Sequence, residues 1–268
     1  MLDDLKKRKQ RLGLTNEELA EKSGVPLGTV QKIMSGITKA PRGETLRALE
    51  KVLFAYPDLE KEPPIPMLEE TFSPYMVSKK RGEYTLEDYL ALPDEARVEL
   101  IDGVLYDMAA PTTIHQHLIV EIAHQIRSQM QSCGEECLLL VAPVDVQLDR
   151  DNKTIVEPDI LILCDKQKLT RSRIVGAPDF IIEILSPSTF QKDLIIKGKK
   201  YQQAGVKEYW MIDPKAKVVL QYDYTNQHPV RFYSFGELVP ILISGGHCRV
   251  DFSEISQNMA MFFEDSSD

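Results

Sequence analysis

Two acidic residues interrupt short apolar runs in the second half of the chain. Asp159 stands near the start of the run at residues 158–163, and Glu183 lies in the middle of the run at residues 179–185. Both runs have the length and composition of central strands that are buried on both faces. A carboxylate in such a strand is costly unless it is paired or binds a metal. Glu183 therefore indicates a metal or catalytic site, with a salt-bridged or edge-strand carboxylate as the alternative, whereas Asp159 could simply be exposed.

Other polar residues stand at the ends of predicted elements. Asp102-Gly103 is a strong signal for a two-residue hairpin turn, because both positions tolerate positive φ. Glu99 precedes this turn by three residues, on the incoming strand. Apolar residues at helical spacing predict a helix over residues 115–130, with His115 at its start.

A further polar set follows Glu183. The spacing predicts a helix over about residues 188–203, which ends near Gly205-Val206. Asp193, Lys197 and Tyr201 recur in it at intervals of four, so they share one helical face.

The elements that must position these residues alternate between helix and strand. A helix is predicted over residues 85–96, and strands are predicted at 138–148 and in the segments Glu-Tyr-Trp-Met-Ile-Asp and Lys-Val-Val-Leu-Gln-Tyr-Asp-Tyr. Such alternation is typical of an α/β or α+β layer. Asp145 lies in the 138–148 segment, but alternation does not decide which face of the strand it takes.

The first 56 residues have a different pattern, with short helices at about 2–11, 15–23, 26–34 and 44–54. Thr15 and Glu18 have the spacing of a capping box, and Gly24 suits the left-handed residue that ends a helix. A helix, a short turn with glycine and a second helix together have the spacing of a helix-turn-helix.

The segment TNEELAEKSGVPLGTVQKIMSG resembles the lambda-repressor-like (Cro-type) helix-turn-helix family. In that family the second helix lies in the DNA major groove, where its early residues meet base edges. By position, the resemblance implies base contacts from Leu27, Gly28, Thr29 and Lys32, and phosphate or minor-groove contacts from Asn16 and Arg42. Leu27 and Gly28 offer no side-chain hydrogen bond to a base, which argues against sharp direct readout. The alternative is a small helical bundle for protein contacts or dimerisation.

Charge and composition bear on the partner and the compartment. The net charge is −9, but residues 1–56 carry 11 Lys/Arg and 7 Asp/Glu, a net of +4, which leaves −13 for the remainder. A basic N-terminal segment joined to an acidic remainder indicates that the protein binds nucleic acid. No apolar run approaches the roughly 18 residues of a membrane span, so no membrane partner is expected. Four cysteines without zinc-ligand spacing are expected to be thiols in a reducing cytosol: Cys133, Cys137, Cys164 and Cys248.

Many ordered segments between about residues 83 and 225 resemble the Uma-type endonuclease family. They are YTLEDYLALP, RVELIDGVL, the His-Gln before a helix, VAPVDVQL, EPDILIL, GAPDFIIEILSPST, the Asp193/Lys197/Tyr201 spacing and GVKEYWMIDP. That family belongs to the PD-(D/E)xK restriction-endonuclease-like superfamily. The resemblance implies a restriction-endonuclease-like α/β (α+β) core with a mixed central sheet flanked by helices, beside the small all-α domain.

The resemblance also implies roles for individual residues. Asp159 matches the aspartate of the Pro-Asp half of the motif, and Glu183 matches the acid of the second half. Position 185 is leucine where the usual lysine would stand, and in the Uma-type pattern that role falls to Lys197. Glu99 matches an additional family acid as a metal or water ligand. His115 matches a family histidine that positions phosphate or water, or else it bonds a backbone group at the helix start.

These residue types suit metal-dependent phosphodiester hydrolysis. The carboxylates of Glu99, Asp159 and Glu183 would bind Mg²⁺ or Mn²⁺ through oxygen, the ligand atom that both ions prefer. A bound cation polarises the scissile phosphate and lowers the pKa of a bound water. Lys197 would orient that water or stabilise the charged transition state, with Asp193 and Tyr201 as its supports.

The sequence thus predicts three segments: a DNA-binding helix-turn-helix domain at 1–56, a Pro-rich linker at 57–82, and a nuclease domain at 83–262. The expected function is metal-dependent cleavage of DNA by a cytoplasmic protein, with a homodimer as a further expectation. One alternative is a transcriptional regulator or antitoxin-like binder whose nuclease-fold domain is catalytically silent. Another is action on RNA or single strands, which no stacking array of aromatic residues supports.

Overall fold

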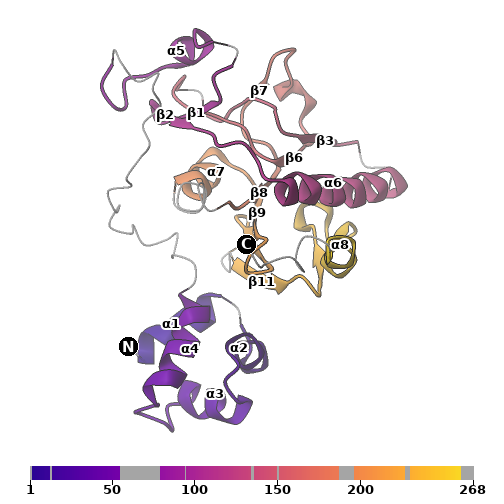
Figure 1. Ribbon diagram of the computed structural model, residues 1–268. Helices are drawn as coiled ribbons and strands as arrows, with labels where there is room; N and C mark the ends of the chain where they lie inside the picture. The colour runs from indigo at the N-terminus through magenta and orange to yellow at the C-terminus, as the bar shows by residue number, and fades with distance from the viewer. Residues whose placement is uncertain are drawn as a thin grey trace.

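The computed structural model describes residues 2–12, 14–54, 79–93, 95–133, 136–149, 151–186, 196–226 and 230–260. Most of the segment predicted as a linker and the position of Asp193 lie outside these ranges. The N-terminal part is a small all-helical unit (Figure 1). Its helices are α1 (Leu2–Arg11), α2 (Asn16–Ser23), α3 (Leu27–Met34) and α4 (Gly43–Leu53).

The predicted start and end of α2 are confirmed. Thr15 Oγ1 accepts a hydrogen bond from the Glu18 amide at 3.1 Å, and Glu18 Oε2 accepts one from the Thr15 amide at 2.6 Å. Gly24 ends the helix with a φ of 68°. The unit encloses its own apolar core, whose buried members are Leu5, Leu12, Leu14, Leu19, Val25, Val30, Ile33, Leu49 and Leu53.

The larger part of the chain is a mixed α/β unit. No helix in the described ranges is long and apolar enough to cross a membrane. The helices of this α/β unit are α5 (Leu86–Leu90), α6 (Thr113–Cys133), α7 (Gly198–Ala204) and α8 (Phe252–Asn258), with 3-10 turns η1 (Lys166–Lys168) and η3 (Leu242–Ser244). Its strands are β1 (Val98–Ile101), β2 (Val104–Asp107), β3 (Leu138–Val141), β4 (Val146–Gln147), β5 (Ile155–Val156), β6 (Ile160–Leu163), β7 (Ile174–Val175), β8 (Phe180–Ile184), β9 (Glu208–Asp213), β10 (Val218–Asp223), β11 (Val230–Ser234), β12 (Leu238–Pro240) and β13 (Arg249–Asp251).

A six-stranded sheet in the order β11-β10-β9-β8-β6-β3 forms the centre of this unit. β8 and β9 are parallel, and the other neighbouring pairs are antiparallel, so the sheet is mixed. Every residue of β6 and of β8 is buried, which confirms the prediction that these two runs are central strands. The predicted fold class, a mixed sheet flanked by helices beside a small helical unit, is confirmed.

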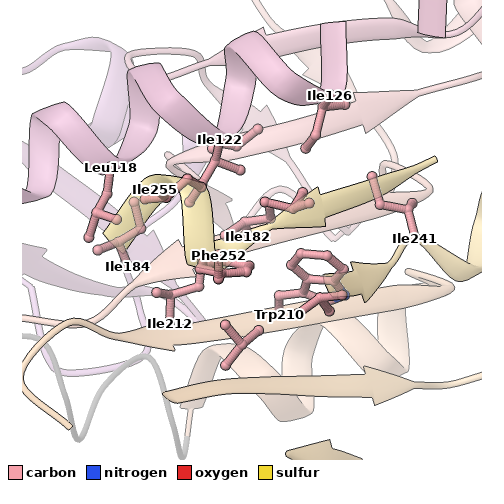
Figure 2. Packing of buried hydrophobic residues seen from close by; sticks show 14 of the residues in the cluster. Leu118, Ile122, Ile126, Ile182, Ile184, Trp210, Ile212, Ile241, Phe252 and Ile255 are labelled. Carbon is pink, nitrogen blue, oxygen red and sulfur yellow. The ribbon is translucent and has the colours of Figure 1, made fainter. Parts of the chain in front are cut away.

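One face of the sheet is covered by α6 and α8 (Figure 2). Leu118, Ile122 and Ile126 of α6 belong to the same buried cluster as Ile182 of β8 and Trp210 of β9. Because side chains alternate along a strand, the even-numbered residues of β6, β8 and β9 face this layer. The odd-numbered residues, Glu183 among them, therefore face the opposite side.

The opposite side carries α7 and a second sheet in the order β2-β1-β5-β4-β7. Tyr201 of α7 and Ile101 of β1 join the buried cluster that contains Ile181 of β8. Glu183 thus lies between the central sheet, α7 and the sheet that contains β1.

Two predicted elements differ in the structure. The helix predicted over 85–96 is only Leu86–Leu90, because Pro93 disfavours helical backbone at the residue before it. The strand predicted over 138–148 is split into β3 and β4, which belong to different sheets. Pro143 lies at the break, where it has no amide hydrogen to contribute to a ladder.

The prediction that the cysteines are thiols is wrong for one pair. Cys137 and Cys164 form a disulfide. The reason lies in the strand register, which pairs Leu138 of β3 with Leu163 of β6. Cys137 directly precedes Leu138 and Cys164 directly follows Leu163, so the antiparallel pairing brings the two cysteines opposite each other. Cys248 is buried and forms no disulfide within the described residues, in agreement with the prediction of a thiol.

Candidate active site

The predicted hairpin is confirmed and positions Glu99. The turn between β1 and β2 has φ values of 49° at Asp102 and 74° at Gly103. A Cβ on Gly103 would lie 2.5 Å from the carbonyl oxygen of Gly82, so only glycine fits there. Glu99, on the incoming strand, is fully buried.

The register of β6 and β8 brings Asp159 and Glu183 together. Ile160 pairs with Ile182 in this antiparallel ladder, so the next pair outward is Asp159 and Glu183. Asp159 Oδ2 also accepts a hydrogen bond from the Ile184 amide at 2.7 Å, which fixes its carboxylate at the end of β8.

Lys197 connects the two buried glutamates. Its Nζ lies 2.8 Å from Glu99 Oε1 and 2.6 Å from Glu183 Oε1, and all three side chains are at most 4% exposed. Tyr201, one helical turn later, donates a hydrogen bond to the same Glu183 oxygen at 2.5 Å. Lys197 and Tyr201 therefore share one face toward Glu183, as their spacing predicted.

Glu157 is a further acidic residue at this site that the sequence reasoning did not single out. Its backbone amide donates a hydrogen bond to Glu99 Oε1 at 3.0 Å. Burial raises the pKa of its carboxyl group, and the charges of Asp145 and Glu99 raise it further. The signal in the sequence was its position directly before Pro158-Asp159.

The sequence did not decide on which side of its strand Asp145 lies. In the structure its side chain points to α5. Tyr89 donates a hydrogen bond to Asp145 Oδ1 at 2.9 Å. Burial raises the pKa of Asp145, and it also raises the pKa of the Tyr89 phenol, with a further contribution from the charge of Asp145. Asp145 and Glu157 thus extend the acidic site toward α5.

His115 of α6 reaches the site from the other side of Asp159. Its Nε2 lies 3.2 Å from Asp159 Oδ2, and the two side chains are 13% and 14% exposed. Asp159 is therefore neither simply exposed nor fully buried. The histidine side chain thus faces a carboxylate, and its role toward phosphate or water stays a prediction.

The donor set suits a hard divalent cation, but the carboxylates are engaged by Lys197 and His115. Within the described ranges, only Asp102, Asp149 and Asp151 place three carboxylate oxygens within 4.8 Å of one another. Lys200 Nζ lies 2.7 Å from both Asp102 and Asp149, so an ammonium group already compensates two of these charges. We therefore assign no cation to this second acidic group.

The residues predicted to contact DNA lie on or beside α2, α3 and α4. Leu27 begins α3 and is 37% exposed, while Gly28 and Lys32 are exposed on the same helix and Thr29 is half-buried. No neighbour lies within 4 Å of a Cβ built on Gly28, so this end of α3 is open. Arg42 is exposed directly before α4. Asn16 begins α2, and its Oδ1 is buried without a hydrogen-bond partner within the described ranges.

Comparison with known proteins agrees with both resemblances. The Uma2 family model, described as "Putative restriction endonuclease", matches residues 86–241, and a helix-turn-helix family model matches residues 5–59. None of the curated proteins matches the chain. A solved structure from Anabaena variabilis, titled as a putative nuclease belonging to DUF820, shares 23% identity and a TM-score of 0.52. It covers 63% of this chain and 97% of its own, and it supports the fold.

Proposed function

Because the chain belongs to the Uma2 family of putative restriction endonucleases, we propose that it is a metal-dependent endonuclease that hydrolyses phosphodiester bonds in DNA. The observation that carries this proposal is the contact of Lys197 with both Glu99 and Glu183 in the buried centre of the family domain. Asp159 and Glu183 are the next residues beyond the Ile160–Ile182 pair of the β6–β8 ladder, so a third carboxylate lies at the same end of these strands.

In this proposal Glu99, Asp159 and Glu183 hold Mg²⁺ or Mn²⁺. Carboxylate oxygens are the ligands that such hard cations prefer. A cation bound there supplies polarisation of the scissile phosphate and a lowered pKa for a bound water.

The other residues orient the reacting groups. Lys197, when it faces substrate, orients the attacking water or stabilises the charge that develops on the phosphate. His115, which is held by Asp159, positions the phosphate or a water. Tyr201 fixes the Glu183 carboxylate through its hydroxyl group.

The helix-turn-helix domain brings the nuclease to DNA. The proposed contacts come from Asn16, Leu27, Gly28, Thr29, Lys32 and Arg42. We propose the same division of the chain as the sequence predicted, with DNA binding at 1–56, a linker at 57–82 and cleavage at 83–262. A cytoplasmic location and a homodimer belong to this proposal as well.

The test is cleavage of supercoiled and linear DNA by the full chain with Mg²⁺, with Mn²⁺ and with a chelator. We expect metal-dependent cutting that falls on the order of 100-fold or more in Glu183→Gln, because the variant loses a charged ligand. Asp159→Ala should abolish cleavage and leave DNA binding intact. Glu95→Gln, a change at an exposed glutamate of the same domain, serves as the control. Equal cutting by the parent and the Glu183 or Asp159 variants would refute the assignment.

The alternative is a DNA-binding regulator with a catalytically silent domain. Its supporting observation is that the described carboxylates of the site are paired with Lys197 and His115 and do not form a group of three within 4.8 Å. It predicts DNA binding without cutting under every metal condition.

A further inference from the structure

Lys197 occupies the space between the two buried glutamates of the site. Its ammonium group contacts Glu99 Oε1 and Glu183 Oε1, and its side chain is 3% exposed. We infer that Lys197 is the resident cation of the metal-free site, and that a divalent cation that bridges Glu99 Oε1 and Glu183 Oε1 displaces it. The inference rests on the proposed function, because it concerns how the proposed metal site is filled.

The hydrogen bonds at the two oxygens support this exchange. A carboxylate oxygen has about two lone-pair directions. Glu99 Oε1 accepts from Lys197 and from the Glu157 amide, while Glu183 Oε1 accepts from Lys197 and from the Tyr201 hydroxyl. Both directions of each oxygen are therefore in use. A cation that binds these two oxygens must take the place of one donor at each, and Lys197 is the donor that the two oxygens share.

Charge favours the same exchange. A divalent cation carries twice the charge of the Lys197 ammonium group, so at the same distance it attracts the two carboxylates more strongly. A divalent cation would neutralise both glutamates. The Lys197 ammonium would then be repelled by the cation and become available to substrate. In this arrangement Lys197 faces DNA only when the metal is present, so metal binding and the availability of the lysine to substrate are coupled.

Metal affinity in Lys197→Met tests the inference without reference to cleavage. Mn²⁺ binding would be measured by titration calorimetry on the full chain, on this variant and on Lys215→Met, a change at an exposed lysine of the same unit. We expect binding to Lys197→Met to be roughly tenfold tighter or more, because no ammonium group competes. Lys215→Met should match the parent. Equal or weaker binding to Lys197→Met would overturn the inference.

Glu183→Gln separates this result from the proposed function. It should weaken Mn²⁺ binding in the parent and in the Lys197→Met background, and any binding that remains does not involve the Glu183 carboxylate. If no Mn²⁺ binding depended on Glu183, the proposed metal site itself would be wrong, and the inference would fall with it.

A second measurement uses the unaltered protein, in case Lys197→Met does not fold. Reductive methylation of lysines, followed by mass spectrometry, reports the exposure of each ammonium group. Lys197 should label slowly without metal and several-fold faster with saturating Mn²⁺, while Lys215 labels at one rate throughout. Labelling of Lys197 that stays unchanged or slows with Mn²⁺ would contradict the displacement.

Discussion

Glu183 illustrates how one charged residue is accommodated in an apolar strand. Its neighbours in β8 are all buried, and its Oε1 receives both the Lys197 ammonium and the Tyr201 hydroxyl. Burial and the nearby charge of Glu183 hold the pKa of Tyr201 well above its ordinary value, so the phenol remains a donor. Tyr201 is therefore a positioning residue for the carboxylate.

Tyr201→Phe should lower the free energy of unfolding by about 1.5–3 kcal/mol, because a buried charged group loses a hydrogen bond. Cleavage should fall by roughly 10- to 100-fold, as expected for a group that orients a metal ligand. Urea unfolding and the plasmid assay measure the two effects. Tyr233→Phe removes a 3.3 Å bond to Gln221 on β10 and serves as the control. A Tyr201 variant with parental stability and activity would rule out this role.

At the scale of elements, Lys200 ties α7 to the hairpin that carries Glu99. It bonds Asp102 in the turn and Asp149 in the segment between β4 and β5, each at 2.7 Å. Burial lowers the pKa of Lys200, but the hydrogen bonds to the two carboxylates raise it more, so the net shift is upward and the ammonium form persists. This second contact between α7 and the hairpin lies outside the site and restrains the helix that follows Lys197.

Lys200→Met should loosen α7 without unfolding the protein. Because Asp102 is 61% exposed, solvent screening limits the expected loss of stability to about 1 kcal/mol. Hydrogen exchange at residues 198–204 should become faster, and Lys200→Arg should restore part of the protection. Lys215→Met provides the comparison. Unchanged exchange in α7 would mean that the contact does not restrain the helix.

Glu208 links η3 to the central sheet. Its carboxylate is almost fully buried and accepts hydrogen bonds from Trp210 Nε1, Gln221 Nε2 and the amides of Leu242 and Ile243. Burial outweighs these four donors and raises the pKa of Glu208 to about 7.

This shift predicts a pH-dependent stability. Between the ordinary pKa of 4.5 and about 7, the folded protein binds more protons at Glu208 than the unfolded chain does. The contribution of Glu208 is therefore fully present below pH 4.5 and is lost as the pH rises through about 7, on the order of 3–4 kcal/mol in total. Urea unfolding between pH 5 and 8 should show this fall in the parent and a flatter profile in Glu208→Gln. Parallel profiles would disprove the assignment, and Glu95→Gln should follow the parent.

At the scale of the whole molecule, charge is divided between the two units. Residues 1–56 have a net charge of +4, although the chain as a whole has −9. An acidic nuclease domain repels the DNA backbone, so the basic helical domain must supply the attraction in the proposed function.

Lys32→Ala should separate binding from cleavage. If Lys32 contacts a base edge, affinity for the preferred sequence should fall by about 1–3 kcal/mol, and specificity at that base should relax. The cleavage rate at saturating DNA should remain that of the parent, because the nuclease site is unchanged. Lys51→Ala, an exposed lysine of α4, is the matched control. An equal loss in both variants would point to net charge instead of a specific contact.

The sequence by itself determined the features that depend on a few neighbouring residues. The Thr15 capping box, the Asp102-Gly103 turn and the buried runs of β6 and β8 follow from local hydrogen bonding, backbone preference and side-chain alternation. The ordered motifs also indicated the family, while the site residues that they name stay a prediction. These signals depend on residues close together in the chain, so they can be recognised without knowledge of the fold.

Only the tertiary structure decided which groups meet. The contact of Lys197 with Glu99 joins α7 to β1, and the disulfide between Cys137 and Cys164 depends on the β3–β6 register. The orientation of Asp145 toward Tyr89 is of the same kind. Such contacts join segments far apart in the chain, and their geometry depends on how sheets and helices pack. Local sequence preferences do not encode that packing individually, because it is a property of the folded chain as a whole.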